Sequence, residues 1–455
     1  MIEGTSNRIR DRERDAILQS LRAGVVPRSG QQHIQVGRQH EIQAVVDDIA
    51  RVADGGSTIR FIIGEYGSGK TFFLMLMRAI ALRERLVSVH ADLSPDRRLQ
   101  GGGGQARSLY AELMRNLSTR SKPDGGGLAS VVERFATSAI EEATQRELSV
   151  GTIIAGRLRG LQELVGGFDF ATVIETYWNG YDSGNEELVS DAVRWLRGEF
   201  LTKTDARSAL GVRTIVDDAN WYDHLKLMAR FVRMAGYQGL FICIDELVNL
   251  YKLANTTSRS ANYEQLLRIL NDSLQGSASG MGWLLGGTPE FLLDTRRGLY
   301  SYQALQSRLE ENTFATSGLV DYSGPVLRLA NLSQEDFYVL LTKLRNVYAG
   351  GDPAKYLLSD DALTAFMTHC SERVGDAYFR TPRNTIKEFI NLMAVLEQNP
   401  EAQWAGLLGD VEIKPETNAD LAPLPELAQH EATGGAAPES EPAPQGDDDL
   451  SSFRL

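Results

Sequence analysis

Residues 64–71 have the types and the spacing of a phosphate-binding P-loop. They lie between an apolar run at 61–63 and an apolar helical pattern that begins at Phe72. Glycines let backbone N–H groups turn toward a phosphate, and a helix N-terminus adds the positive end of its dipole. We expect Lys70 to contact the β- and γ-phosphates of ATP and the Thr71 hydroxyl to bind Mg²⁺. The residues expected around the nucleotide are Gly64, Glu65, Tyr66, Gly67, Ser68, Gly69, Lys70, Thr71 and Phe72.

Two adjacent carboxylates follow another apolar run. Residues 240–244 have the pattern of a buried strand, and Asp245 and Glu246 come directly after them. Such a pair is common by itself. Beside a P-loop it predicts that Asp245 holds the Mg²⁺ shell and that Glu246 polarises the attacking water, with Asp92 as the next candidate for that role. The second carboxylate favours hydrolysis of ATP over a kinase-like use of the same loop.

Three further residues could act on the γ-phosphate. Thr288 ends a strand-like run and could bond to the γ-phosphate or to the attacking water, although residues 286–289 could equally form a simple tight turn. Arg308 could reach the nucleotide of a neighbouring subunit, and its alternative is an ion pair with a nearby carboxylate such as Glu310. Arg383 opens a helical pattern and could reach the nucleotide of its own chain, but most surface arginines are solvated.

Five short apolar runs with strand character must position these residues. They occupy residues 59–63, 86–91, 240–244, 283–285 and 326–329, and helical patterns separate them. This alternation predicts an α/β fold of the P-loop NTPase kind, with a parallel sheet covered by helices on both faces. The second and third runs are about 150 residues apart, too far for an ordinary crossover. The helical patterns over about 97–220 therefore predict a helical insertion.

The chain divides into four predicted parts. Residues 1–58 form a helical lead-in, and residues 59–330 form the ATPase core with its insertion. Residues 331–400 form an α-helical lid, at whose start Ser333 and Asp336 have the spacing of a helix N-cap. Residues 410–455 hold 6 of the 14 prolines and contribute −9 to the net charge of −13, so they predict a disordered acidic tail. The remainder is close to neutral, which neither excludes nor demonstrates a basic surface for DNA.

Composition is that of a globular protein. The hydrophobic fraction is 42% and the charged fraction 24%, which allows a sizeable core. No apolar run approaches the roughly 18 residues that span a bilayer, and the charged N-terminus has no apolar signal segment. The two cysteines make no disulfide framework, so we expect a cytoplasmic protein. The scattered histidines predict no metal beyond nucleotide-bound Mg²⁺.

These motifs together resemble an AAA+ ATPase. Val36-Gly37-Arg38 before a helical pattern is similar to the origin-recognition branch, which implies that Val36 and Gly37 lie near the adenine. The chain also resembles the BrxD-like ATP-binding family of BREX phage defence, over nearly its whole length. That resemblance implies an ATPase that works beside a DNA helicase or a methylation machinery against phage DNA. The phrases that carry it are residues 21–27, 91–95, 287–290, 381–383 and 449–455.

Three functions fit these residues. The first is a motor or switch in which ATP turnover changes the contacts to DNA or to a partner helicase. The second is an interaction scaffold that binds ATP without turnover and has no need of Glu246. The third is an initiator-like DNA binder or loader, which requires a winged helix after the lid, where only about a dozen residues precede the tail. An Arg308 that acts between subunits would make the protein a homo-oligomer.

Overall fold

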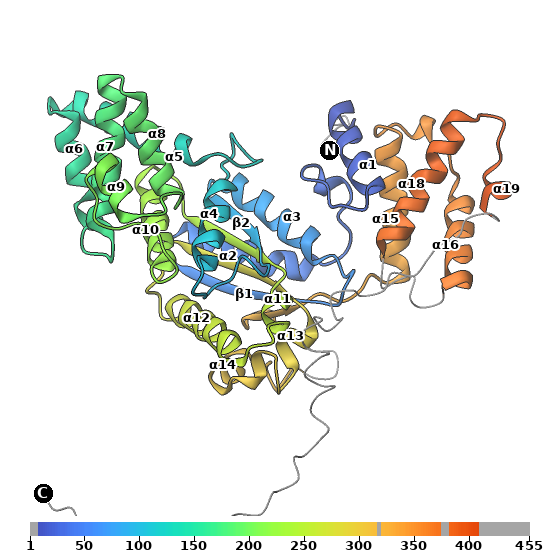
Figure 1. Ribbon diagram of the computed structural model, residues 1–455. Helices are drawn as coiled ribbons and strands as arrows, with labels where there is room; N and C mark the ends of the chain where they lie inside the picture. The colour runs from blue at the N-terminus through green and yellow to red at the C-terminus, as the bar shows by residue number, and fades with distance from the viewer. Residues whose placement is uncertain (1–7, 316–319, 375–381, 409–455) are drawn as a thin grey trace, which may run out of the picture. The chain divides into compact units, whose positions relative to one another are not determined.

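A five-stranded parallel sheet organises the chain in this computed structural model (Figure 1). The strands lie in the order β2-β3-β4-β1-β5, and all neighbouring strands are parallel. The structure describes residues 8–315, 320–374 and 382–408, so the predicted acidic tail lies outside the described residues. All five predicted strands are confirmed. Their bounds are β1 Ser57–Ile63, β2 Val87–Asp92, β3 Leu240–Asp245, β4 Met281–Gly287 and β5 Val326–Arg328.

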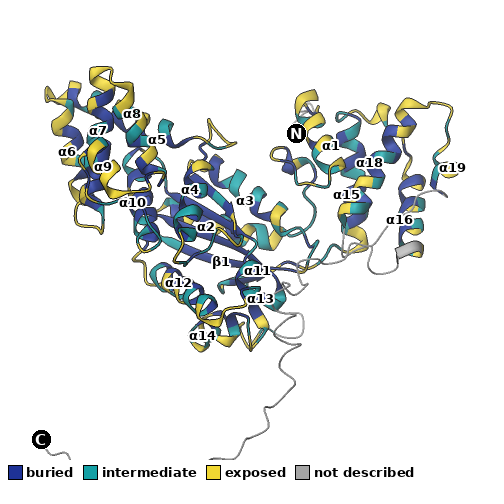
Figure 2. Cartoon of the chain, viewed as in Figure 1, coloured by how far each residue is buried: buried dark blue, intermediate teal, exposed yellow. Residues whose placement is uncertain are grey.

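Helices cover both faces of the sheet, which is why its strands read as continuous apolar runs. On one face, α2 and α3 pack against strand residues such as Ile62 and Leu284. On the other face, α4, α10 and α12 pack against strand residues such as Phe61 and Trp283. Figure 2 shows the strands buried between these layers. The predicted fold class is therefore confirmed. The helices are α2 Gln39–Ala53, α3 Lys70–Arg83, α4 Gln105–Arg115, α10 Trp221–Met234 and α12 Thr256–Leu274.

The interval between β2 and β3 is helical, as the sequence predicts. Its side chains belong to the same apolar cluster as α10 and one face of the sheet. Phe135 and Phe170 both lie against Phe231 of α10, with ring centroids 5.1 and 5.6 Å apart. The insertion therefore shares its core with the sheet. Besides α4, its elements are α5 Leu128–Arg146, α6 Val150–Leu158, the short 3₁₀ helix η2 Arg159–Leu161, α7 Gly167–Ser183, α8 Glu186–Leu196 and α9 Lys203–Leu210.

The C-terminal helices have an apolar core that includes α1. Phe337, Phe366 and Phe389 lie in this core with Ile17, and the rings of Phe366 and Phe389 are 5.2 Å apart. Ser333 and Asp336 form a full capping box at the start of α15, as their spacing predicts. The helix α1 therefore packs with the C-terminal helices, although it lies at the other end of the sequence. The elements are α1 Asp11–Arg22, α15 Gln334–Tyr348, α16 Asp360–Val374, α18 Pro382–Gln398 and α19 Trp404–Leu408.

Short helical turns lie in several of the other described connections. The segment before α2 contains the 3₁₀ turn η1, Gln31–His33. Gly30, with φ of +82°, begins this turn, and the His33 N–H closes it on the Gly30 carbonyl. The others are α11 Val248–Tyr251, α13 Pro289–Leu293, η3 Leu299–Ser301, α14 Gln303–Leu309 and η4 Pro353–Lys355.

Candidate functional site

The carboxyl ends of the parallel strands meet at one edge of the sheet. There Ile63, the last residue of β1, is in register with Gly287 of β4 and Arg328 of β5, and Asp92 is in register with Asp245. The chain leaves β1 for β2 on one side of the sheet. After β4 it crosses over to β5, which lies on the other side of β1. Open α/β sheets bind ligands at such a switch point, outside the carboxyl ends of the strands.

The P-loop joins β1 to α3 through two left-handed glycines. Gly67 and Gly69 have φ of 81° and 82°, which other residues adopt only with strain. Gly64 has no room for a side chain, because an added Cβ would lie 2.4 Å from Ser68 Oγ. The helix α3 begins at Lys70, and no described side chain caps its N-terminus. Its first backbone N–H groups are therefore suited to bind a phosphate.

The Lys70 ammonium lies over the P-loop. Its Nζ donates to the carbonyls of Gly64 and Glu65, each at 2.9 Å. These bonds hold the cation beside the backbone that would curve around a phosphate. A phosphate oxygen carries charge and is a stronger acceptor than a neutral carbonyl. The geometry is therefore suited to the phosphate contact expected of Lys70.

Thr71 and Asp245 are brought into contact. The Thr71 hydroxyl donates to Asp245 Oδ2 at 2.7 Å, and Asp245 is buried. Gly286 on the neighbouring strand makes room for this carboxylate, since a Cβ there would lie 2.3 Å from Asp245 Oδ1. Mg²⁺ is usually held by one or two protein oxygens together with water and substrate phosphates. The pair therefore fits an ion bound with the nucleotide. Within the described ranges, no cluster of three or more His, Cys, Asp or Glu side chains could hold a metal.

Glu246 follows Asp245 in a left-handed conformation, with φ of 61°. Its N–H donates to Asp245 Oδ1 at 2.9 Å, and the Leu247 N–H donates to the Gly286 carbonyl at 3.0 Å. These bonds hold a non-glycine residue in a conformation that costs roughly 1–3 kcal/mol. Such strain is concentrated at functional sites, and here it falls on the residue predicted to activate water.

Asp92 adds a third carboxylate to this edge. It ends β2 in register with Asp245, and the Leu93 N–H continues the ladder to the Asp245 carbonyl at 3.0 Å. Burial, followed by the neighbouring Asp245, raises the pKa of Asp92 above its ordinary value. The sequence offers Asp92 as the next candidate after Glu246, but its register with Asp245 does not follow from local pattern, because it depends on the strand order.

Thr288 lies next to the start of the P-loop. It directly follows β4, and the Gly64 N–H donates to the carbonyl of Gly287 at 3.2 Å. Thr288 is buried, and its hydroxyl accepts from the Phe291 N–H at 3.4 Å as the N-cap of α13. The residue therefore has a local structural role at the place where the sequence predicts a γ-phosphate contact.

Arg308 lies on α14 and is exposed. Its Nε donates to Asn271 Oδ1 on α12 at 2.8 Å, and its Nη1 donates to the Ala304 carbonyl at 2.7 Å. The carboxylate partners considered from the sequence are not used, and Glu311 pairs instead with Arg328. Within its own chain, Arg308 therefore bonds to α12 and to its own helix rather than to the P-loop.

Arg383 connects the C-terminal helices with the P-loop. Its Nη1 donates to the Tyr66 hydroxyl at 3.3 Å, and its guanidinium lies 5.8 Å from the centre of the Tyr66 ring. Val36 and Phe72 are partly buried against the apolar cluster of the same C-terminal helices. The structure thus brings Tyr66 of the P-loop to the start of α18 and packs Val36 and Phe72 against the C-terminal helices.

Two further side chains hold the P-loop from outside, and sequence patterns assign a role to neither. Asn331 Nδ2 donates to Glu65 Oε2 at 3.0 Å, and the Arg38 guanidinium donates to the Ser68 carbonyl. Asn331 follows the last predicted strand, and Arg38 follows Gly37 in the segment expected near the adenine. These positions are the signal by which the sequence could have singled out Arg38 and Asn331. Their contacts could not be predicted in this way, because Arg38 and Ser68 are 30 residues apart and Asn331 and Glu65 are 266 residues apart.

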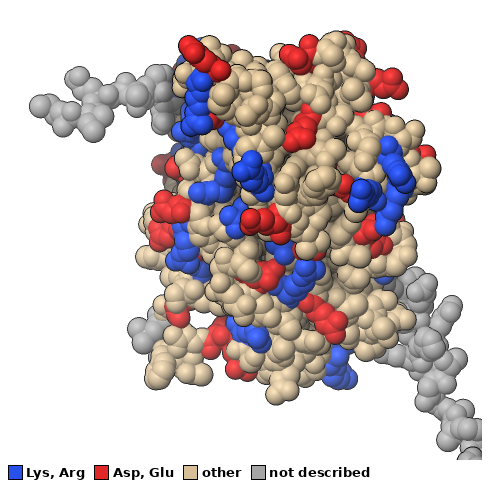
Figure 3. Space-filling model, turned by 90° about the vertical axis from the view of Figure 1, so that its left-hand side faces the viewer, with Lys and Arg blue, Asp and Glu red and all other residues tan. Residues whose placement is uncertain are grey.

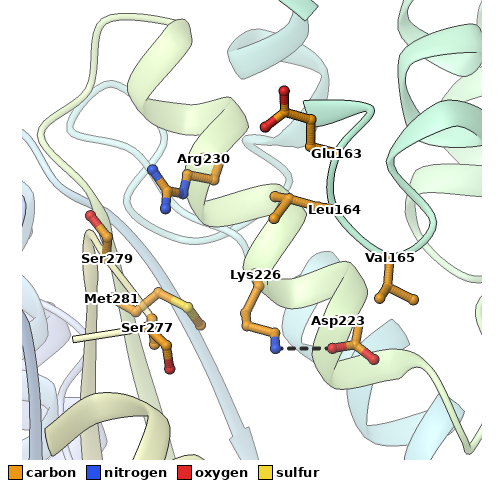
Figure 4. A pocket seen from close by; sticks show the side chains of 10 residues that line it. Glu163, Leu164, Val165, Asp223, Lys226, Arg230, Ser277, Ser279 and Met281 are labelled. Atoms are coloured by element: carbon orange, nitrogen blue, oxygen red, sulfur yellow. Dashed lines mark ion pairs between the residues drawn. The ribbon is translucent and has the colours of Figure 1, made fainter. Parts of the chain in front are cut away.

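A cavity of about 190 Å³ lies elsewhere (Figure 4). Lys226 and Arg230 of α10, Val165 before α7 and Met281 of β4 are among its lining residues, and Lys226 pairs with Asp223 at 3.0 Å. Met281 is the first residue of β4, whereas the P-loop follows the last residue of β1. The cavity is therefore at the opposite ends of the strands from the predicted nucleotide site.

A known protein family matches most of this chain. Residues 9–412 match the family described as BREX system ATP-binding protein BrxC/D. The chain belongs to the BrxC/D family. The match confirms the predicted resemblance to a family of ATP-binding proteins. The matched residues include the P-loop of this chain. No curated protein matches it. Among the described residues of this BrxC/D chain, no helix has both the length and the apolar character needed to cross a membrane.

Proposed function

We propose that this BrxC/D chain hydrolyses ATP and uses the turnover as a motor or switch in DNA-directed phage defence. The observation that carries the proposal is the Thr71–Asp245 hydrogen bond, with Glu246 next to it and the P-loop at the same sheet edge. Phosphate ligands, Mg²⁺ ligands and a water-activating carboxylate are then available together. A scaffold that only binds ATP would not require Glu246.

In this mechanism, Lys70 and the N–H groups at the start of α3 hold the β- and γ-phosphates. Thr71 and Asp245 would hold Mg²⁺, which when bound would neutralise charge on the phosphate oxygens. Glu246 accepts a proton from water as the water oxygen attacks the γ-phosphorus, and Thr288 orients that water. The bond between the γ-phosphorus and the bridging oxygen breaks, and ADP leaves with the bridging oxygen.

The C-terminal helices and a neighbouring subunit supply the two arginines. Arg383, through its contact with Tyr66, brings the start of α18 to the P-loop, where it would respond to a γ-phosphate. Arg308 would act on the nucleotide of an adjacent copy, since its bonds within its own chain lead to α12. The protein would then act as a homo-oligomer whose sites are shared between subunits.

We propose further that a DNA helicase is the partner and that DNA is contacted directly or through it. On the face drawn in Figure 3, basic and acidic side chains are intermixed. A duplex-binding track would instead gather several Lys and Arg residues along one stripe. The buried thiols of Cys243 and Cys370 and the use of ATP are compatible with the expected cytoplasmic location.

Release of phosphate from ATP in the presence of Mg²⁺ tests the proposal, with the chain alone and with duplex DNA or a helicase added. Lys70→Ala is the matched variant because it removes the cation dedicated to the phosphates. We expect turnover in the wild type, and in the variant a roughly tenfold or greater loss of affinity for a non-hydrolysable ATP analogue. Wild-type binding without turnover under all these conditions would favour the scaffold. Unchanged binding in folded Lys70→Ala would overturn the P-loop assignment.

A further inference from the structure

The turn that precedes α2 is held in an unusual conformation. Gly37 and Arg38 have φ of 62° and 61°, so two consecutive residues lie in the left-handed region. Glycine adopts this conformation without strain, but for arginine it carries a cost that surrounding contacts must offset. The contacts of the Arg38 side chain are therefore the ones expected to offset this strain.

The Arg38 guanidinium bonds to two segments that are far apart in the sequence. It donates to the carbonyl of Ser68 inside the P-loop and, at 3.2 Å, to the carbonyl of Ala330. Ala330 lies between the end of β5 and Ser333, the N-cap of α15. A Cβ on Gly69 would lie 3.3 Å from Arg38 Nη1, so the guanidinium also lies directly against the P-loop backbone. One side chain thus bridges the P-loop and the connection to the C-terminal helices.

The neighbouring residues attach the same turn to α15. A Cβ on Gly37 would lie only 2.9 Å from Oδ1 of Asp336, the residue that completes the capping box of α15. About two turns of helix further on, Lys343 donates to the carbonyl of Gln35. Burial lowers the pKa of Arg38, while the neighbouring carboxylates of Glu41 and Asp336 act in the opposite direction.

We propose that Arg38 is a positioning residue that couples the nucleotide state of the P-loop to the C-terminal helices. By fixing the Ser68 carbonyl it orients the peptide units that lead into Lys70, and through Ala330 it holds the strand end from which α15 starts. A planar guanidinium can serve two acceptors at once in fixed directions, which an ammonium does less well. This inference rests on the proposed nucleotide site and adds the route by which that site would reach the lid.

Hydrogen exchange of the full chain, with and without Mg²⁺ and a non-hydrolysable ATP analogue, tests the coupling. In the wild type, the analogue should slow exchange both in the P-loop and at residues 331–336. In Arg38→Ala, analogue binding should be roughly tenfold or more weaker. At saturating analogue the P-loop should still be protected, but the protection at residues 331–336 should be lost. Arg38→Lys should restore it only in part.

Two further variants make the result specific. Gly37→Ala leaves Arg38 in place but forces a Cβ against Asp336, and it should also abolish protection at residues 331–336. Arg134→Ala removes another arginine–carbonyl bond, from α5 of the insertion to Ala235 at the end of α10, and should behave as the wild type. Should Arg38→Ala fail to fold, Gly37→Ala decides the question. Protection at residues 331–336 that survives in Arg38→Ala or Gly37→Ala, or is absent from a nucleotide-bound wild type, overturns the coupling. A wild type that binds no nucleotide overturns the proposed site instead.

Discussion

The Thr71 hydroxyl donates a 2.7 Å hydrogen bond to the Asp245 carboxylate across a sequence separation of 174 residues. The bond joins the first turn of α3 to the end of β3, and Gly286 on the adjacent strand makes room for it. Because Asp245 orients the hydroxyl that would hold Mg²⁺, the two residues should act on the ion as one unit.

Asp245→Ala should therefore weaken nucleotide binding only when Mg²⁺ is present. Loss of such an orienting partner typically lowers metal affinity by roughly 10- to 100-fold. Calorimetry with an ATP analogue, in Mg²⁺ and in a chelator, measures the difference. Thr71→Ser, which keeps the hydroxyl, is the matched control and should stay close to the wild type. An equal loss of binding in both conditions would instead indicate a general defect in the P-loop.

Arg308 is predicted to act on the nucleotide of a neighbouring copy. Arg308→Ala lacks this arginine but keeps its own P-loop, whereas Lys70→Ala lacks the P-loop cation but keeps Arg308. Arg308→Ala should be nearly inactive alone, because an arginine in this role contributes on the order of 10³-fold in rate or more. Lys70→Ala should be nearly inactive alone because it lacks the cation that holds the phosphates. Mixing the two should restore part of the turnover in a phosphate-release assay.

The control for this experiment is Arg296→Ala, which removes an exposed arginine between α13 and η3 and should keep wild-type turnover. If mixing restores nothing and the specific activity of the wild type does not depend on its concentration, the site is not shared between subunits. The Arg308 bonds to Asn271 and Ala304 would then be its whole role.

Because His224 is buried, the protein should lose stability in mild acid. Its ring lies between Tyr110 and Trp195, at 6.3 and 5.3 Å between centroids, and burial lowers its pKa from 6.5 to about 4 despite nearby carboxylates. As the pH falls below 6.5, the unfolded chain takes up this proton before the folded one. The free energy of unfolding should therefore decrease between pH 6.5 and 4, by up to roughly 1.4 kcal/mol per pH unit for this residue.

Denaturant unfolding at several pH values checks this expectation. His224→Gln should reduce the slope of stability against pH in that window, even if it lowers the stability itself. Burial also lowers the pKa of His90 to about 4, so the double variant His90→Gln/His224→Gln should flatten the slope further. A slope that His224→Gln leaves unchanged would contradict the assignment.

The strands and the P-loop could be predicted because their signals are local. Glycines at 64, 67 and 69, an apolar run before them and a Lys-Thr after them define the loop within a few residues. The capping box of Ser333 and Asp336 is equally local. Fold class then follows from the alternation of strand and helix patterns, because a parallel sheet must be covered on both faces.

The rest of the site depends on tertiary packing. The register of Asp92 with Asp245 requires the strand order, and the packing of Ile17 with the lid helices joins opposite ends of the described chain. The bond from Arg308 to Asn271 replaces the ion pair that sequence proximity suggests, because α14 packs against α12. Long polar side chains have several partners within reach, and only the fold selects among them.

The central claim, that this chain is a hydrolase and not only an ATP-binding protein, is tested most directly on Glu246. Glu246→Gln preserves the size of the side chain and one acceptor oxygen but cannot accept the proton from water. Binding of ATP and single-turnover hydrolysis should be measured on the same preparation. We expect binding close to that of the wild type and hydrolysis slower by roughly 10²-fold or more. Hydrolysis at the wild-type rate in Glu246→Gln would contradict the account and move the catalytic role to another carboxylate, with Asp92 the first to test.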